Sequence, residues 1–205
     1  MIVLALDTTG VDCSVIVYDS NAHYILGSYF KNLGRGHAEY LIPAIDCALR
    51  DSQLDISQID RIVTALGPGS FTGVRVSIAV ARGISLVLGK SAFGVGNLEV
   101  LARSHLDTHA GRPVMVLVSL LHKKICRQTF SVDGIPLSEP VLLNYEQTRF
   151  EVDNFEGEII GSGFSVIKGI EGENDHLPMD VLARLGILKT GIAPSPIYLR
   201  SPCTL

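Results

Sequence analysis

Short apolar runs alternate with polar turns at the start of the chain and predict an α/β fold. Ile2 to Leu6, Cys13 to Tyr18 and Tyr24 to Phe30 are rich in β-branched and aromatic residues, with turn residues between them. Apolar residues then recur at helical spacing from His37 to Gln53. The pattern therefore predicts three strands joined by tight turns, followed by an amphipathic helix.

Two residues of that predicted helix need interpretation. Pro43 lies too far in for an ideal first turn, so the helix either starts near Tyr40 or kinks at the proline. His37 is a tempting metal ligand, because His-x-x-x-His would place two imidazoles on one helix face. Position 41 is leucine, however, so the lone His37 is interpreted as a packing or capping residue.

A glycine-rich stretch, Gly67 to Gly73, separates the apolar run Ile62 to Leu66 from an apolar segment that reaches Leu88. This order predicts strand, loop and helix. The glycines allow backbone angles that a side chain would forbid, and Ser70 or Thr72 can cap the helix that follows. We place the stretch at the centre of the fold.

Backbone N–H groups at such a helix start can hold a phosphate, but the same geometry can also be a tight crossover with close packing. Asp7 and Thr8, at the exit of the first strand, could face a phosphate or cap a turn. The degenerate phosphate-loop candidates are Asp7, Thr8, Gly67, Gly69 and Ser70. The stretch lacks the lysine of a Walker loop, and we place the structural interpretation above nucleotide binding.

The helix expected from Phe71 to Leu88 is apolar over much of its circumference. One stripe contains Val74, Ile78, Ala81 and Leu88, and another contains Val76, Val80, Ile84 and Val87. It carries Arg75 and Arg82 and falls short of the roughly 20 apolar residues of a membrane span. We therefore expect a buried helix, and because one domain cannot cover so many apolar sides, we expect a partner chain to cover the remainder.

The second half opens as the first does. A polar stretch at 107–113 marks the expected domain boundary, which gives domains 1–106 and 107–205. Later elements are predicted as strands at 114–121 and 124–132, a strand and turn at 159–163, a helix at 179–188 and an extended end at 194–200. Val116 to Ser119 occupies the place that Val3 to Leu6 has in the first half.

Composition narrows the functional classes. Of 205 residues, 47% are hydrophobic and 19% are charged, which supports well-formed cores. A net charge of −4 gives no global electrostatic footprint for nucleic acid, so direct RNA binding is not the first hypothesis. Four scattered cysteines suit reduced thiols in a cytosol, and the apolar start is expected to be a first strand and not a signal peptide.

Four motifs together resemble the YeaZ family over nearly the whole chain. They are Asp7-Thr8-Thr9, the segment 37–41, the run Gly67-Pro68-Gly69-Ser70-Phe71-Thr72-Gly73-Val74-Arg75, and Pro196 to Arg200. The resemblance implies two actin/Hsp70-like (ASKHA, ribonuclease H-like) α/β domains, the second reduced. It also implies a cytoplasmic, non-catalytic role in making threonylcarbamoyladenosine beside the tRNA anticodon.

In that family the catalytic paralogue TsaD carries the metal and transfers the threonylcarbamoyl group. The positions that would have to supply its metal ligands are occupied here by Leu41, Asn97 and Leu101. The resemblance therefore implies no metal and no cofactor. The chain also departs from its own family, because Ser119-Leu120-Leu121 stands where Asp-Ala-Arg is usual. An acidic residue opening the second domain, as an ATPase requires, is therefore missing.

The resemblance further implies that the chain acts by binding TsaD, with TsaE in a larger complex, and touches tRNA only indirectly. When alone it is expected to form a homodimer through the same helices. The expected interface residues are His37, Leu41, Ile45, Thr72, Arg75, Ile78, Ala79 and Arg82. The alternative is an ATP-handling or glycoprotease-like enzyme of the same superfamily, although no Gly-x-Ser-x-Gly surrounds Ser70.

Overall fold

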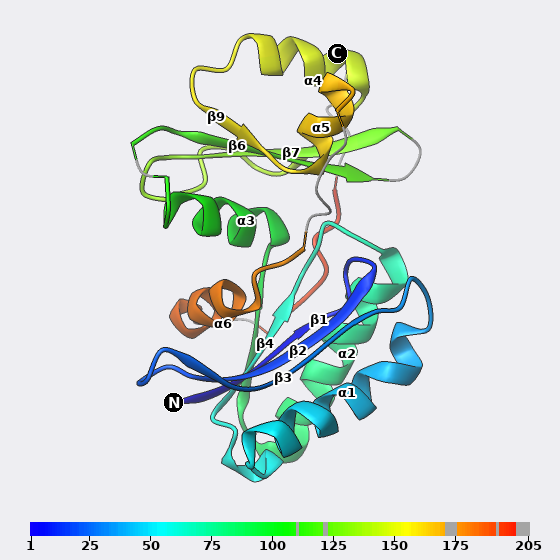
Figure 1. Cartoon of the computed structure of the whole chain (residues 1–205), viewed down its shortest axis with the longest axis vertical. Helices are drawn as coiled ribbons and strands as arrows, with labels where there is room; N and C mark the ends of the chain where they lie inside the picture. The colour runs from blue at the N-terminus through cyan, green and yellow to red at the C-terminus, as the bar shows by residue number, and fades with distance from the viewer. Residues whose placement is uncertain (110, 121–122, 171–175, 192, 200–205) are drawn as a thin grey trace. The chain divides into compact units, whose positions relative to one another are not determined.

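The computed structural model describes residues 1–109, 111–120, 123–170, 176–191 and 193–199. The chain divides into two compact units. Met1–Asn97 and His176–Ile197 form the first, and Leu98–Asp175 and Tyr198–Leu205 form the second. Each unit contains one β-sheet with helices on both faces (Figure 1).

The sheet of the first unit has five strands in the order β3-β2-β1-β4-β5. The strands are β1 (Ile2–Asp7), β2 (Asp12–Asp19), β3 (Tyr24–Asn32), β4 (Arg61–Ala65) and β5 (Ser91–Val95). The first three form an antiparallel meander, whereas β4 runs parallel to β1 and β5 runs parallel to β4. The predicted strands and tight turns of this half are confirmed.

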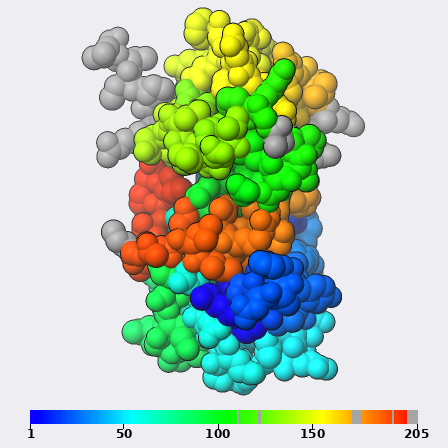
Figure 2. Space-filling model, turned by 90° about the vertical axis from the view of Figure 1, so that its left-hand side faces the viewer, coloured from blue at the N-terminus to red at the C-terminus, as the bar shows by residue number. Residues whose placement is uncertain are grey.

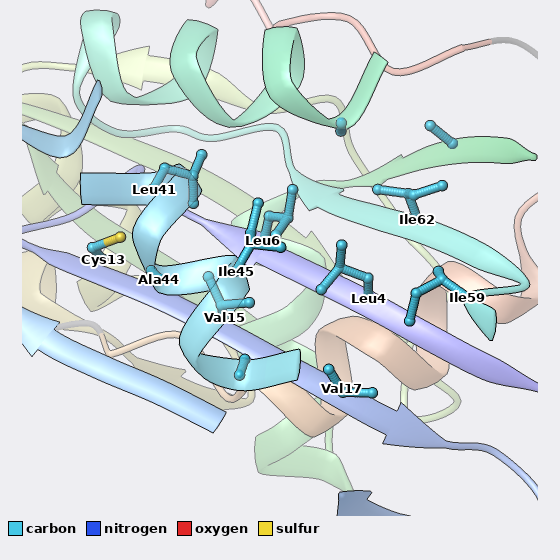
Figure 3. Packing of buried hydrophobic residues seen from close by; sticks show 13 residues of the cluster. Leu4, Leu6, Cys13, Val15, Val17, Leu41, Ala44, Ile45, Ile59 and Ile62 are labelled. Atoms are coloured by element: carbon cyan, nitrogen blue, oxygen red, sulfur yellow. The ribbon is translucent and has the colours of Figure 1, made fainter. Parts of the chain in front are cut away.

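Helices cover both faces of this sheet. On one face lie α1 (His37–Ser52) and α2 (Phe71–Leu88), and a short 3-10 helix, η1 (Ile56–Gln58), follows α1. On the other face lies α6 (Met179–Leu188), which is visible in orange at the surface beside the blue N-terminal strands in Figure 2. Alternation along β1 sends Leu4 and Leu6 toward Leu41 and Ile45 of α1 (Figure 3).

Helix α1 begins at His37, after Gly36 in a left-handed conformation, and not near Tyr40. It continues through Pro43 to Ser52. A proline at this position removes one hydrogen bond, the one to the carbonyl group of Glu39. Glu39 and Pro43 are both exposed, so water can replace the missing donor.

The sheet of the second unit has four strands in the order β8-β7-β6-β9. They are β6 (Val114–Leu120), β7 (Lys124–Phe130), β8 (Val141–Leu143) and β9 (Glu158–Ile160). Strand β6 pairs antiparallel with β7 and parallel with β9, just as β1 pairs antiparallel with β2 and parallel with β4. Strand β8 pairs antiparallel with β7. The expected repetition of the opening of the first half is present in this strand order.

Alternation along β6 divides the second core in two. Val114 and Val116 pack toward α3 (Asn97–Leu106), and Met115 and Leu117 pack toward α4 (Tyr145–Asp153) and α5 (Ser162–Lys168). Sequence analysis missed β8, α4 and α5, because these segments are short and only weakly periodic. Leu121 and His122 of the predicted turn, and Arg200 of the predicted end, lie outside the described residues.

The compact units differ from the predicted domains 1–106 and 107–205. Helix α3 groups with the second unit, since Leu98, Ala102 and Leu106 complete the core around β6. Helix α6 returns to the first unit, where Arg61 Nη1 donates to the carbonyl oxygens of Gly186, Ile187 and Lys189 at 2.7–3.1 Å. Local sequence patterns cannot reveal such a return of the chain.

The close approach of α6 to the sheet generates a stability prediction. A Cβ at Gly186 would lie 2.3 Å from a methyl carbon of Val63. We expect Gly186→Ala to lower the free energy of unfolding by about 1–3 kcal/mol, because the helix must shift away from β4. Urea unfolding followed by circular dichroism measures the change.

Gly83→Ala is the matched control, because Gly83 is also helical but has no atom within 4 Å of its Cβ position. It should leave stability unchanged or raise it by about 0.5–1 kcal/mol through lower backbone entropy in the unfolded chain. Equal effects of the two substitutions would contradict the close packing of α6 on β4.

Candidate functional site

Asp7 ends β1 and organises the turn that follows. Its Oδ1 accepts hydrogen bonds from the amide and the hydroxyl of Thr9, at 2.8 and 2.7 Å. The carboxyl is only 5% exposed, and burial raises its pKa above the ordinary value, against the opposing effect of the Thr9 hydrogen bonds. The side chain therefore caps its own turn, one of the two roles predicted for it.

Asn97, the first residue of α3, connects this turn to the glycine loop. Its Nδ2 donates to Thr9 Oγ1 at 2.6 Å and to the carbonyl oxygen of Pro68 at 3.2 Å. Its Oδ1 accepts from the amide of Gly67 at 3.1 Å. Asn97 is 7% exposed, so this amide group satisfies polar atoms that water hardly reaches.

The glycine loop packs directly on the backbone that follows β1. A Cβ at Gly69 would lie 2.3 Å from the carbonyl oxygen of Thr9, and one at Gly73 would lie 1.9 Å from that of Thr8. The Thr8 hydroxyl donates to the carbonyl oxygen of Gly73 at 2.7 Å. Both glycines are thus required by close backbone approach, and threonine backbone fills the space beside the loop.

Three amides of the loop donate to acceptors within the protein itself. The Ser70 amide donates to the carbonyl oxygen of Thr9 at 2.7 Å, and the Gly73 amide donates to Ser70 Oγ at 3.2 Å, which caps α2. The Gly67 amide donates to Asn97 Oδ1, so all three of these amides already have an acceptor within the protein. The geometry favours the crossover interpretation of the five candidates Asp7, Thr8, Gly67, Gly69 and Ser70.

The positions at which TsaD-type metal ligands would be needed have other roles here. Leu41 is fully buried in the first core, and Leu101 packs in the second. His37 lies near Asp7, and among the described residues its buried Nε2 has no hydrogen-bond partner. Among the described residues no three His, Cys, Asp or Glu side chains form a group that could hold a metal ion.

Two buried thiols offer little nucleophilic chemistry. Burial raises the pKa of the Cys13 thiol to about 11 and that of the Cys126 thiol to about 12. A thiol reacts as the thiolate, which is scarce at neutral pH for such values. Both cysteines therefore act as small core residues.

A second candidate site is the outer face of α2. Its inner face, which packs on the sheet, contains Gly73, Val74, Ser77, Ile78 and Ala81. The exposed residues of the helix are Phe71, Thr72, Arg75, Ala79, Arg82, Gly83, Leu86 and Val87, and we call them the α2 face. Leu86 and Val87 are each 84% exposed, and the Arg75 guanidinium lies 3.6 Å from the centre of the Phe71 ring.

Three of the predicted interface residues are buried within the chain itself. Leu41, Ile45 and Ile78 are 0%, 4% and 4% exposed, and they belong to the inner faces of their helices. The expectation of a buried α2 is likewise only half met. Periodicity shows how many apolar stripes a helix has, but it does not show which stripe the sheet covers.

Phe71, Leu86 and Val87 of α2 and Ile42 of α1 are exposed apolar residues that were not among the predicted interface residues. No sequence signal separates the two sides of α2, because the small residues Ser77 and Ala81 face the sheet whereas Ala79 and Gly83 are exposed. By length and composition, α2 could cross a membrane, and it is the one helix of the described chain that could. Core helices of soluble proteins pass the same test.

Comparison with known proteins identifies the family. A profile described as "TsaD: tRNA N6-adenosine threonylcarbamoyltransferase" matches residues 27–135. The protein named tRNA threonylcarbamoyladenosine biosynthesis protein TsaB from Haemophilus influenzae is 27% identical, over 98% of this chain and 94% of that protein. Its namesake from Buchnera aphidicola subsp. Schizaphis graminum is 31% identical, over 58% of this chain and 55% of the relative.

Solved structures agree in fold. YeaZ from Pseudomonas aeruginosa superimposes with a TM-score of 0.76 at 24% identity, over 97% of this chain and 99% of that one. A second Pseudomonas aeruginosa structure, titled as similar to peptidase YEAZ, gives a TM-score of 0.79 at the same identity and coverage. Since the profile matches more than half of the 205 residues, the chain belongs to this TsaD-type family, within its TsaB (YeaZ) branch.

Proposed function

We propose that the chain is a non-catalytic subunit that binds TsaD and so takes part in forming threonylcarbamoyladenosine in tRNA. The observation that carries the proposal is the α2 face, a long exposed helix surface of apolar and small residues with two arginines among them. Exposed apolar surface of this kind marks protein interfaces. The complex would be cytoplasmic, with TsaE in a larger assembly and tRNA held mainly by other subunits.

Exposed residues of α1 extend this surface. Ile42 is 57% exposed, and Pro43, Asp46 and Cys47 are exposed beside it. Helices α1 and α2 lie on the same face of the first sheet (Figure 1), so one partner can contact both. Thr72, Ala79 and Gly83 let a partner helix approach closely, and Leu86 and Val87 provide apolar area to bury.

The polar network around Asp7 supports a non-catalytic role. The similar strand orders of the two sheets suggest that this chain descends from an actin-like enzyme. In such an enzyme, carboxylates and loop amides must face the nucleotide. Here Asp7 binds its own turn, and the amides of Gly67, Ser70 and Gly73 bind neighbouring protein atoms. The rival hypothesis of an ATP-handling or glycoprotease-like enzyme has no comparable observation in its favour.

Substitution of Ala79 tests the docking face. Ala79 is exposed in the single chain, so Ala79→Glu should fold normally but place an unpaired charge in the interface. We expect the wild type to bind TsaD in a pull-down and the variant to lose about 2–4 kcal/mol of binding free energy. Co-purification with TsaD, with the mass of the complex determined, is the direct measurement.

The same variant tests self-association. Without its partner the wild type should form a two-fold dimer through the α2 face, because an isologous contact can cover the exposed surface. Light scattering should then show a dimer for the wild type and a folded monomer for Ala79→Glu. A variant that stays dimeric and retains TsaD would place the interface elsewhere.

Asp7 gives a prediction with a defined pH dependence. Burial raises the folded-state pKa of Asp7, so the folded state favours the protonated carboxyl. Its contribution to stability is complete below the unfolded-state pKa and is lost as pH rises through the folded-state pKa. Relative to Asp7→Asn, which does not titrate, the wild type should therefore become less stable as pH rises above about 4.

Urea unfolding over a pH series measures that difference. Asp7→Asn should also keep TsaD binding, and isothermal titration of the isolated wild type with ATP or Mg²⁺ should show no stoichiometric binding. Micromolar ATP binding that disappears in Asp7→Asn would instead support the enzyme hypothesis.

A further inference from the structure

A pocket of about 380 Å³ lies at the carboxyl end of α2. The last turns of α2, the start of β5 and the segment after α6 line it, and all three belong to the first unit. Arg82, Ser85, Lys90 and Ser91 provide polar groups, and Leu86 lies at its wall. This volume is within the range of pockets that take a ligand or a large side chain.

The pocket carries two positive charges and no negative one. Its lining includes Arg82 and Lys90 and no Asp or Glu. In the part of the chain that the structure describes, neither of these two side chains has an ion-pair partner. A concave basic site on a protein of net charge −4 attracts an anionic group.

The helix dipole explains only one of the two cations. A positive charge in the last turn stabilises the negative end of a helix, and Lys90 follows the C-cap Gly89 closely. Arg82 lies nearly two turns before the end of α2 at Leu88, and the dipole effect is confined to the last turn. The helix dipole therefore does not account for the position of Arg82 at the pocket.

The pocket is continuous with the α2 face. Arg82 and Leu86 belong to both, and Val87, 84% exposed, adjoins them. A helix that covered the α2 face would reach the pocket at one end. A free phosphate would use the two cations but leave the apolar residues Leu86 and Val87 uncovered.

We propose that the pocket receives a carboxylate side chain from the partner that docks on the α2 face. This inference rests on the proposed function and specifies the chemistry of the partner: an apolar helix with Asp or Glu near the end that meets Arg82 and Lys90. A second copy presenting its own α2 is a poorer fit, because α2 contains no Asp or Glu. Arginine can bind the carboxylate through two parallel hydrogen bonds, and the lysine adds a second charge.

Charge substitutions at Lys90 test the proposal. Lys90 is exposed, and its side chain makes no hydrogen bond among the described atoms, so its variants should fold. By calorimetry with purified TsaD, Lys90→Glu should weaken binding at least about 30-fold, and Lys90→Gln by a smaller factor. Arg149→Glu makes the same charge change at an exposed position of α4 and should bind as the wild type does.

Salt provides a second readout. Raising the ionic strength from 50 to 500 mM should weaken TsaD binding by the wild type more than TsaD binding by Lys90→Gln, because screening acts on the charge that the variant lacks. If Lys90→Glu binds TsaD with wild-type affinity while Ala79→Glu binds it more weakly, the carboxylate proposal is overturned and the docking proposal stands. Full binding by Ala79→Glu would overturn the docking proposal itself.

Two further measurements use the isolated chain. Inorganic phosphate or ATP should not bind to it in a manner that depends on Lys90. If either does, while Lys90→Glu retains TsaD, the pocket is a phosphate site and the proposal is wrong. The homodimer should be less sensitive to Lys90→Glu than the complex with TsaD, because a second α2 supplies no carboxylate.

Discussion

The first unit depends on one chain of buried hydrogen bonds, which runs from Asn97 through the Thr9 hydroxyl to the Asp7 carboxyl. Each of these groups is shielded from water, so each must be satisfied by the others. The same Asn97 amide fixes both ends of the Gly67-Pro68 segment. These bonds hold the loop against the turn after β1 and so position the start of α2 relative to the sheet. The α2 face is thus a consequence of polar atoms buried at its base.

Much of the fold could be predicted from periodicity, because each sheet buries alternate residues of its strands. The limit appears in α2, where Ile78 was assigned to the surface and lies in the core. Its apolar stripes are alike in sequence, and only the position of the sheet decides which one is covered. The return of α6 to the first unit is beyond any local pattern, since the residues that it contacts are far away in sequence.

The candidate site could be located from the sequence, and its structural interpretation could be ranked first, but the physical reason for that ranking is visible only in the backbone geometry. A glycine run after a strand is compatible both with a bound phosphate and with a close crossover. The distinction lies in the carbonyl oxygens of Thr8 and Thr9, which stand where Cβ atoms on Gly73 and Gly69 would have to be. The spacing of residues in the sequence does not predict this close contact between the two backbone segments. The basic pocket was equally invisible, because β5 and the segment after α6 complete it.

The position of α6 has a consequence for how the protein is made. Translation completes β1 to β5 and then Leu98–Asp175, the larger segment of the second unit, before α6 leaves the ribosome. Until then one face of the first sheet, including Val63, lacks the helix that buries it. The first sheet therefore completes its packing only after α6 has emerged, and until then the nascent chain carries an exposed apolar sheet face of the kind that promotes aggregation.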